Sequence, residues 1–206
     1  RTGLLVSEVG FGGWAIGGDR SGYSYGPTDD AESLRAIARA RDLGCTFFET
    51  ADVYGRGHSE ALLGRALGSA RARVVLATAV GSDFRRGAAQ DFSPAFVERA
   101  VEASLGRLDT DYLDVLFLHF PPRAVAGAPE TYAAPECLRR AGKVRWLGLS
   151  ALDPGDAAGA IAAGAVDVVQ VPYSLLDQRT GALFGQAAQR DVGLVAAAPL
   201  GEGFLA

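Results

Sequence analysis

Short apolar segments alternate with longer segments of helical periodicity along the chain. The apolar segments are nearly continuous instead of alternating in polarity, which is typical of strands buried on both faces of a parallel sheet. This alternation predicts repeated β-α units and therefore an α/β protein. The seven apolar segments are residues 9–11, 46–48, 74–78, 113–118, 144–149, 166–171 and 194–197.

The helical segments begin at recognisable capping residues. Residues 93–94 and 153–154 each place Ser or Asp directly before Pro, and Ser59 precedes an acidic residue. A side-chain oxygen or a proline in the first turn suits the free N–H groups at a helix start. Between residues 96 and 108, apolar side chains recur every three or four positions and give one face for packing on the sheet. We expect residues 1–206 to form a single domain.

A series of such units can form either an open doubly wound sheet or a closed barrel, and the periodicity does not separate the two. A Gly-x-Gly-x-x-Gly turn leading directly into a helix would favour the open sheet. Residues 10–14 (GFGGW) are glycine-rich but lead into a polar loop. The absence of this fingerprint favours a TIM-type (β/α) barrel.

Composition and charge exclude several classes of protein. The chain is 49% hydrophobic and 21% charged with a net charge of -4, so it lacks the basic excess that nucleic-acid binding needs. No apolar run approaches the ~20 residues that span a bilayer. Cys45 and Cys137 show no Cys-x-x-Cys spacing, so neither a disulfide nor a metal site is expected. We expect a cytoplasmic protein with a small-molecule substrate and no nucleic-acid or membrane partner.

The absence of Met from the sequence, even at position 1, is consistent with a partial or trimmed chain.

In a β/α barrel the active site lies at the carboxyl ends of the strands. Glu49, Tyr54 and His119 follow predicted strands and would bring a carboxylate, a phenol and an imidazole to one mouth. This set is suited to acid-base chemistry. Each side chain also has a structural interpretation: Tyr54 as a half-buried tyrosine, Glu49 as a loop cap, and His119 as a core histidine.

Several segments are similar to the signatures of aldo-keto reductases. They are residues 47–55 (FFETADVYG), 111–119 (DYLDVLFLH), 142–150 (GKVRWLGLS), 170–176 (QVPYSLL) and 199–201 (PLG). The resemblance implies a TIM-type (β/α) barrel that is incomplete in this chain, with about seven β-α units and the eighth strand missing. It also implies carbonyl reduction with NADP(H) by a tetrad of Asp, Tyr, Lys and His. An uncovered strand edge would favour a homo-oligomer.

The match to the tetrad is incomplete. By resemblance, Tyr54 is the proton-donating tyrosine and His119 orients the substrate carbonyl, whereas Glu49 stands in the place of Asp. Ala79 stands in the place of Lys, and alanine cannot lower the pKa of a neighbouring tyrosine as an ammonium does. The only lysine, Lys143, is expected at the opposite end of the barrel.

The cofactor positions match in part. By resemblance, Ser150 and Gln170 match residues that hold the nicotinamide, and Trp14 is a further candidate. Ala151 and Ala197 replace the family's asparagine and its stacking aromatic residue. NADP(H) therefore follows from the resemblance alone, and the residues themselves favour no cofactor.

The candidates for a substrate pocket are aromatic or charged residues near the predicted mouth. They can line an apolar pocket or pack and solvate loops, and the sequence leaves both interpretations open. Two arginines among them are the nearest substitutes for the missing lysine. The candidates are Trp14, Tyr23, Tyr25, Asp52, Arg85 and Arg86.

The sequence leaves three functional hypotheses. The first is an enzyme repurposed for cofactor-independent acid-base chemistry on a small carbonyl or hydroxyl compound, through Tyr54 and His119. Dehydration, isomerisation or cyclisation would fit, because the residues that handle protons are retained. The alternatives are an NADPH-dependent carbonyl reductase and a non-catalytic barrel subunit.

Overall fold

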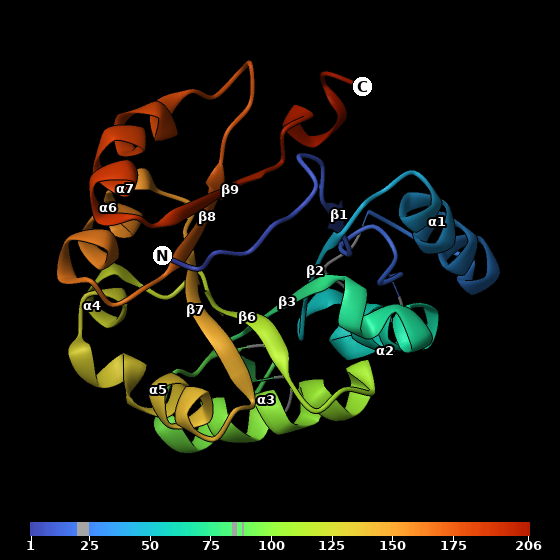
Figure 1. Ribbon diagram of the computed structural model, residues 1–206, viewed down its shortest axis with the longest axis horizontal. Helices are drawn as coiled ribbons and strands as arrows, with labels where there is room; N and C mark the ends of the chain where they lie inside the picture. Colours follow the sequence, from blue (N-terminus) through green and yellow to red (C-terminus); the bar gives the residue numbers. More distant parts are fainter. Residues whose placement is uncertain (20–24, 84–85, 88) are drawn as a thin grey trace.

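The computed structural model describes residues 1–19, 25–83, 86–87 and 89–206, and its main feature is one curled parallel sheet (Figure 1). The spatial order of the strands, β1-β2-β3-β6-β7-β8-β9, is also their order along the chain. The predicted parallel β/α architecture is therefore confirmed. The strands are β1 (Phe11–Gly12), β2 (Phe47–Ala51), β3 (Val75–Val80), β6 (Leu113–His119), β7 (Val144–Ser150), β8 (Val168–Pro172) and β9 (Gly193–Ala197).

Helices cover the outer face of the curled sheet (Figure 1). No helix in the described ranges is long and apolar enough to cross a membrane. The α-helices are α1 (Asp30–Asp42), α2 (His58–Leu67), α3 (Pro94–Leu108), α4 (Arg123–Ala126), α5 (Ala133–Arg140), α6 (Pro154–Ala163) and α7 (Phe184–Arg190). The 3₁₀ turns are η1 (Tyr54–Gly57), η2 (Gly68–Arg73), η4 (Pro129–Tyr132), η5 (Arg179–Leu183) and η6 (Gly201–Gly203).

The sheet has two edges, β1 and β9, which do not pair with each other among the described residues. A closed barrel has no such edges, because every strand pairs on both sides. The prediction of an incomplete barrel of about seven units is thus confirmed.

Two apolar clusters hold the layers together. The larger lies between helices and sheet and includes Leu63 of α2, Val101 of α3 and Leu147 of β7. The smaller, called the inner cluster below, includes Ala79 of β3 and Phe117 of β6. Because successive strand residues point to opposite faces, a strand buried on both sides contributes to both clusters.

Two of the helix starts follow the predicted capping. Asp153 precedes α6, and its side chain accepts a hydrogen bond from the Gly155 amide at 2.7 Å. Ser93 precedes α3 with proline in the first turn, although its side chain makes no capping bond.

The predicted cap at Ser59 is wrong. Helix α2 begins at His58, two residues earlier than a cap at Ser59 implies, and Gly57 precedes it in the left-handed conformation. The Ser59 hydroxyl instead donates to the Gly13 carbonyl and accepts from the Thr50 hydroxyl, each at 2.8 Å. A buried hydroxyl must find partners where it lies, and here it ties the turn after β1 to β2.

A small antiparallel hairpin, β4 (Ser82–Asp83) and β5 (Ala89–Gln90), follows β3 and was not predicted. Two-residue strands carry no periodicity that a sequence can reveal. The turn into the hairpin needs Gly81, whose φ is 145°. A Cβ at this position would lie 2.4 Å from the Phe92 ring.

Candidate active site

Three of the polar residues predicted at the mouth lie on neighbouring strands at one level of the sheet. His119 ends β6 and is in register with Ser150, which ends β7. Ser150 is in turn in register with Gln170 of β8. Glu49 was predicted after a strand ending at residue 48, but β2 continues to Ala51 and includes it.

Tyr54 begins η1, separated by two residues from the end of β2, and its ring contacts two other rings at the mouth. Its ring stacks on Trp14, with centroids 6.1 Å apart, and meets His119 edge to face at 5.9 Å. Trp14 in turn contacts Tyr25 at 4.7 Å. The structure therefore brings Tyr54 and His119 together and places both aromatic pocket candidates of the described chain beside them.

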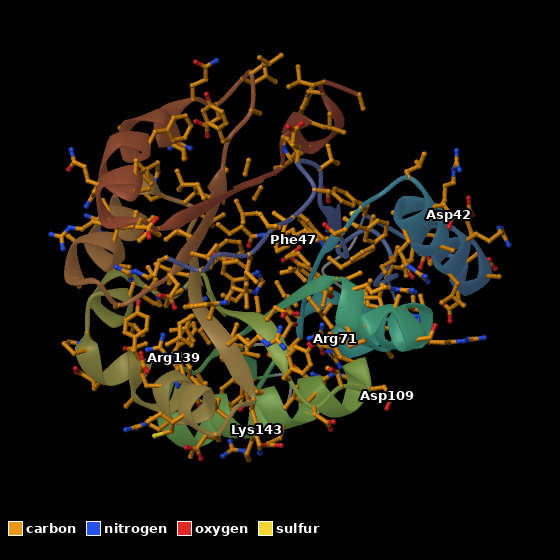
Figure 2. All side chains as sticks on the ribbon, viewed as in Figure 1. Asp42, Phe47, Arg71, Asp109, Arg139 and Lys143 are labelled. Atoms are coloured by element: carbon orange, nitrogen blue, oxygen red, sulfur yellow. The ribbon has the colours of Figure 1, made fainter. Side chains whose placement is uncertain are left out.

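Two of the candidate residues, Tyr23 and Arg85, lie outside the described residues. Arg86 is exposed, and its charge acts on Asp91. The only lysine, Lys143, is labelled in Figure 2 and forms an ion pair with Glu102 of α3. As expected, it directly precedes β7, at the opposite end of that strand from Ser150.

The Tyr54 hydroxyl lies in an environment that opposes its ionisation. Burial raises its pKa above the ordinary value, and the negative charges of Glu49, Tyr25 and Asp52 raise it further. Ala79, at the position of the family's lysine, is fully buried in the inner cluster against which Tyr54 packs. With these neighbours Tyr54 keeps its proton at neutral pH.

Glu49 is a buried carboxyl group with one oxygen unsatisfied. Burial raises its pKa to about 7, and a hydrogen bond with Gln170 opposes this rise. Its Oε1 has no hydrogen-bond partner among the described residues. A carboxyl group with this pKa exchanges a proton near neutral pH, which suits an acid or base.

Asp52 lies beneath the mouth, with only 2% of its surface exposed. Burial and the charge of Glu60 raise its pKa to about 8, while Arg107 and the backbone N–H groups of Gly81 and Val53 lower it. Its Oδ1 is likewise without a partner in the described chain. Asp52 therefore favours the neutral form at pH 7, and only its ionised form raises the pKa of Tyr54.

His119 is neutral over the physiological range. Burial lowers its pKa to about 4, and 8% of its surface is exposed. Its ring also packs on Phe120, with centroids 4.3 Å apart. A neutral imidazole carries one N–H donor, which can bind a substrate oxygen.

Sequence reasoning missed the buried Glu60 beneath the mouth. Its carboxylate accepts from the Thr78 hydroxyl of β3 and from Arg107 Nε of α3, each at 2.6 Å. The available signal was the Ser-Glu pair at residues 59–60, which follows the matched segment 47–55 by four residues. Glu60 fixes α2 against β3 and α3 and thereby supports the turn that carries Tyr54.

A nicotinamide cofactor fits the polar donors of this site. The Ser150 hydroxyl donates to Gln170 Oε1 at 2.6 Å, and Glu49 adds an unsatisfied oxygen. A hydroxyl and a carboxyl that both hydrogen-bond the Gln170 amide suit the donors and acceptors of a carboxamide. Ala151 and Ala197 supply neither an amide nor a stacking ring, so the fit rests on the polar groups. The described residues contain no group of three or more metal-ligating side chains.

Comparison with known proteins assigns the family. The model of the aldo/keto reductase family matches residues 8–206. The aldo-keto reductase YhdN of Bacillus subtilis is 35% identical over 182 residues, which are 86% of this chain and 53% of the relative. The chain therefore spans about half the length of this curated relative.

Solved structures agree with this assignment. The holo form of aldo-keto reductase AKR11C1 from Bacillus halodurans superposes with a TM-score of 0.87 at 32% identity, covering 98% of this chain and 65% of that one. An aldo/keto reductase from Klebsiella pneumoniae in complex with NADP and acetate has a TM-score of 0.78 at 31% identity, covering 97% and 67%.

The chain belongs to the aldo/keto reductase family, which confirms the resemblance seen in its motifs. Its relatives are named as reductases, and one is solved with NADP. These findings favour the nicotinamide-dependent alternative over cofactor-independent chemistry, which no comparison supports. The expectation that no cofactor is favoured is likewise unsupported.

Proposed function

We propose that the protein is a nicotinamide-dependent reductase of small carbonyl compounds. The observation that carries the proposal is the arrangement of the mouth. The Tyr54 ring contacts the His119 imidazole, and His119 is in register with Ser150, which hydrogen-bonds Gln170. NADP(H) is the cofactor that the Klebsiella relative suggests. The single domain and the small-molecule substrate remain predictions.

In this proposal, one pair of residues binds the cofactor and another pair contacts the carbonyl oxygen of the substrate. Ser150 and Gln170 would hold the carboxamide of the cofactor, which supplies a hydride to the carbonyl carbon when bound. The Tyr54 hydroxyl donates a hydrogen bond to the carbonyl oxygen and transfers its proton as negative charge develops there. The N–H of neutral His119 donates a second hydrogen bond to the same oxygen. Hydride on carbon and proton on oxygen complete the alcohol.

Glu49 sets the pH range of this reaction. After proton transfer, Tyr54 is a phenolate with no lysine beside it, so a negative Glu49 would oppose its formation. A neutral Glu49 removes this repulsion, and its pKa is about 7. Reduction should therefore be fastest below pH 7 and decline as the pH rises through this value.

Direct binding of NADPH tests the proposal. Saturable quenching of tryptophan fluorescence at micromolar NADPH is expected, and Trp14→Phe should identify whether Trp14 or Trp146 reports it. Replacing Gln170 by Ala should weaken binding about tenfold through the lost amide hydrogen bonds. Gln186→Ala is the matched control, because Gln186 donates to the Ala158 carbonyl on the outer helices. Absence of saturable binding to the wild-type chain would contradict the proposal.

A further inference from the structure

The β4–β5 hairpin contacts the backbone at the end of β6, where His119 lies. Gln90 Nε2 of β5 donates to the Phe120 carbonyl at 2.8 Å and to the His119 carbonyl at 3.3 Å. A primary amide carries two N–H donors, so each carbonyl takes one of them. One side chain thus fixes two successive peptide units next to the imidazole.

The backbone held by Gln90 is in an unusual conformation. Phe120 has a φ of 51°, in the left-handed region that side chains other than glycine rarely adopt. Its N–H donates to the Ser150 carbonyl at 3.1 Å, and its ring packs on the His119 ring. Such a conformation persists only where surrounding bonds hold it, and it often accompanies a functional side chain.

The hairpin presents Gln90 from a fixed position. Ser82 pairs with Gln90 across the two strands. The Asp91 N–H donates to the Gly81 carbonyl at 3.0 Å, and the Phe92 ring closes over Gly81. The backbone of Gly81 in turn hydrogen-bonds the buried Asp52 carboxyl group. Hydrogen bonds therefore connect the segment that carries the Gln90 side chain to the carboxyl ends of β2, β3 and β6.

We propose that Gln90 is a positioning residue for His119. Its two hydrogen bonds hold Phe120 in the left-handed conformation, and this conformation orients the buried imidazole toward Tyr54. The inference rests on the proposed function for the role of His119 in turnover. The orientation and burial of His119 are measurable without any cofactor.

A neutral substitution separates positioning from charge effects. Gln90→Met keeps the length of the side chain and removes both N–H donors. Gln186→Met removes a similar bond, from Gln186 Nε2 to the Ala158 carbonyl at 3.0 Å, on the outer helices. Both variants should fold with similar unfolding midpoints.

The first measurement is the NMR titration of the imidazole ring protons. The chain has two histidines, so His119→Ala assigns the signal of each. The groups that face His119 are Tyr54 and Phe120, and burial alone holds its pKa near 4. In Gln90→Met, the His119 titration should move up toward the ordinary value of about 6.5, because the ring gains access to water. It should stay unchanged in Gln186→Met.

The second measurement is steady-state reduction of an aldehyde with NADPH. Gln90→Met should lower kcat about five- to tenfold with little change in the KM for the aldehyde, because a misplaced donor affects the transition state most. An unchanged His119 titration in Gln90→Met, or the same shift in Gln186→Met, would overturn the inference. Absence of turnover in the wild-type chain would overturn the proposed function instead, and the titration would still decide the role of Gln90.

Discussion

The two ends of the curled sheet differ in whether their buried aspartate and glutamate side chains have partners for every oxygen. At the amino-terminal end, Asp114 of β6 accepts from Arg71 at 2.8 Å, from Arg145 at 2.9 Å and from the Leu76 N–H at 3.0 Å. The Tyr112 ring lies 4.0 Å and 4.1 Å from the same two guanidinium groups. Each oxygen of this carboxylate is satisfied.

Asp167, before β8, repeats this arrangement at the same end. It accepts from Arg139 of α5 at 3.2 Å, from the Leu147 N–H at 3.1 Å and from Arg1 at 3.4 Å. Figure 2 shows Arg71 and Arg139 on separate outer segments, so the two acids anchor different parts of the chain to the sheet.

At the carboxyl end, Glu49 and Asp52 each keep an unsatisfied oxygen, and no arginine or lysine of the described chain forms an ion pair with either. Burial therefore raises their pKa values to about 7 and about 8. Asp114 and Asp167 at the first end are paired and contribute structure, as Glu60 does beneath the mouth, whereas Glu49 and Asp52 favour the neutral form and are available for proton exchange. The difference supports the proposal that reduction takes place at the mouth.

The largest expected effect comes from removing the proton donor of the mouth. Tyr54→Phe should lower kcat/KM for aldehyde reduction by about 10²- to 10⁴-fold, the usual contribution of a general acid. Tyr132→Phe is the matched control, because the buried Tyr132 hydroxyl donates to the Ala126 carbonyl at 2.9 Å away from the mouth. Steady-state assays of both variants with NADPH measure the difference. Comparable losses in the two variants would remove the special role of Tyr54.

The next effect concerns stability at the opposite end. Asp114→Asn should lower the free energy of unfolding by about 3 to 5 kcal/mol, because it leaves Arg71 and Arg145 without a buried partner. The exposed pair of Lys143 with Glu102 is the control, and Glu102→Gln should cost less than about 1 kcal/mol. Urea unfolding at pH 7 gives both values. A small loss in Asp114→Asn would break the contrast between the two ends.

Glu49→Gln should have the reverse effect on stability. The folded-state pKa of Glu49 is raised from 4.5 to about 7, so the wild-type chain is fully stabilised below about pH 4.5 and loses stability as the pH rises to about 7. A glutamine cannot ionise and avoids this loss. Relative to wild type, the variant should gain roughly 3 kcal/mol between pH 4 and pH 9. A pH-independent difference in urea unfolding would show that Glu49 is not held neutral by burial.

A smaller effect is expected from restoring a cation. Ala79→Lys should place an ammonium in the inner cluster near Tyr54 and lower the pKa of the phenol by about 1 to 3 units. Ultraviolet difference titration of tyrosinate measures this shift, with Tyr54→Phe as the reference and Ala79→Met as the uncharged control of similar length. Equal titrations in the lysine and methionine variants would refute the explanation offered for the high pKa.

The sequence predicted the strands and the position of the site at their carboxyl ends. It did not predict the raised pKa values of Glu49 and Asp52. Continuous apolar segments predicted the sheet, a strand end predicted His119 at the mouth, and the family resemblance added Ser150. The unsatisfied oxygens of Glu49 and Asp52 depend on which side chains pack around them, and no spacing encodes this. The β4–β5 hairpin and its Gln90 contact escaped prediction because two-residue strands and backbone-directed bonds leave no periodic signal.

Comparison with known proteins corrected the interpretation of Ala79. The lost lysine was interpreted as a sign of cofactor-independent chemistry, but the relatives favour a reductase. The structure offers a physical reason why a reductase can work without this lysine. A phenol that keeps its proton can still donate it to a carbonyl oxygen, provided that Glu49 is neutral.

The most direct test of the account follows the hydride itself. The chain is incubated with a small aldehyde and NADPH deuterated at the transferable position of the nicotinamide, and the product is analysed by mass spectrometry. The account predicts an alcohol that carries one deuterium on the former carbonyl carbon, with one NADPH oxidised per alcohol formed and no product from Tyr54→Phe. Conversion of the aldehyde without NADPH oxidation and without deuterium in the product would contradict it.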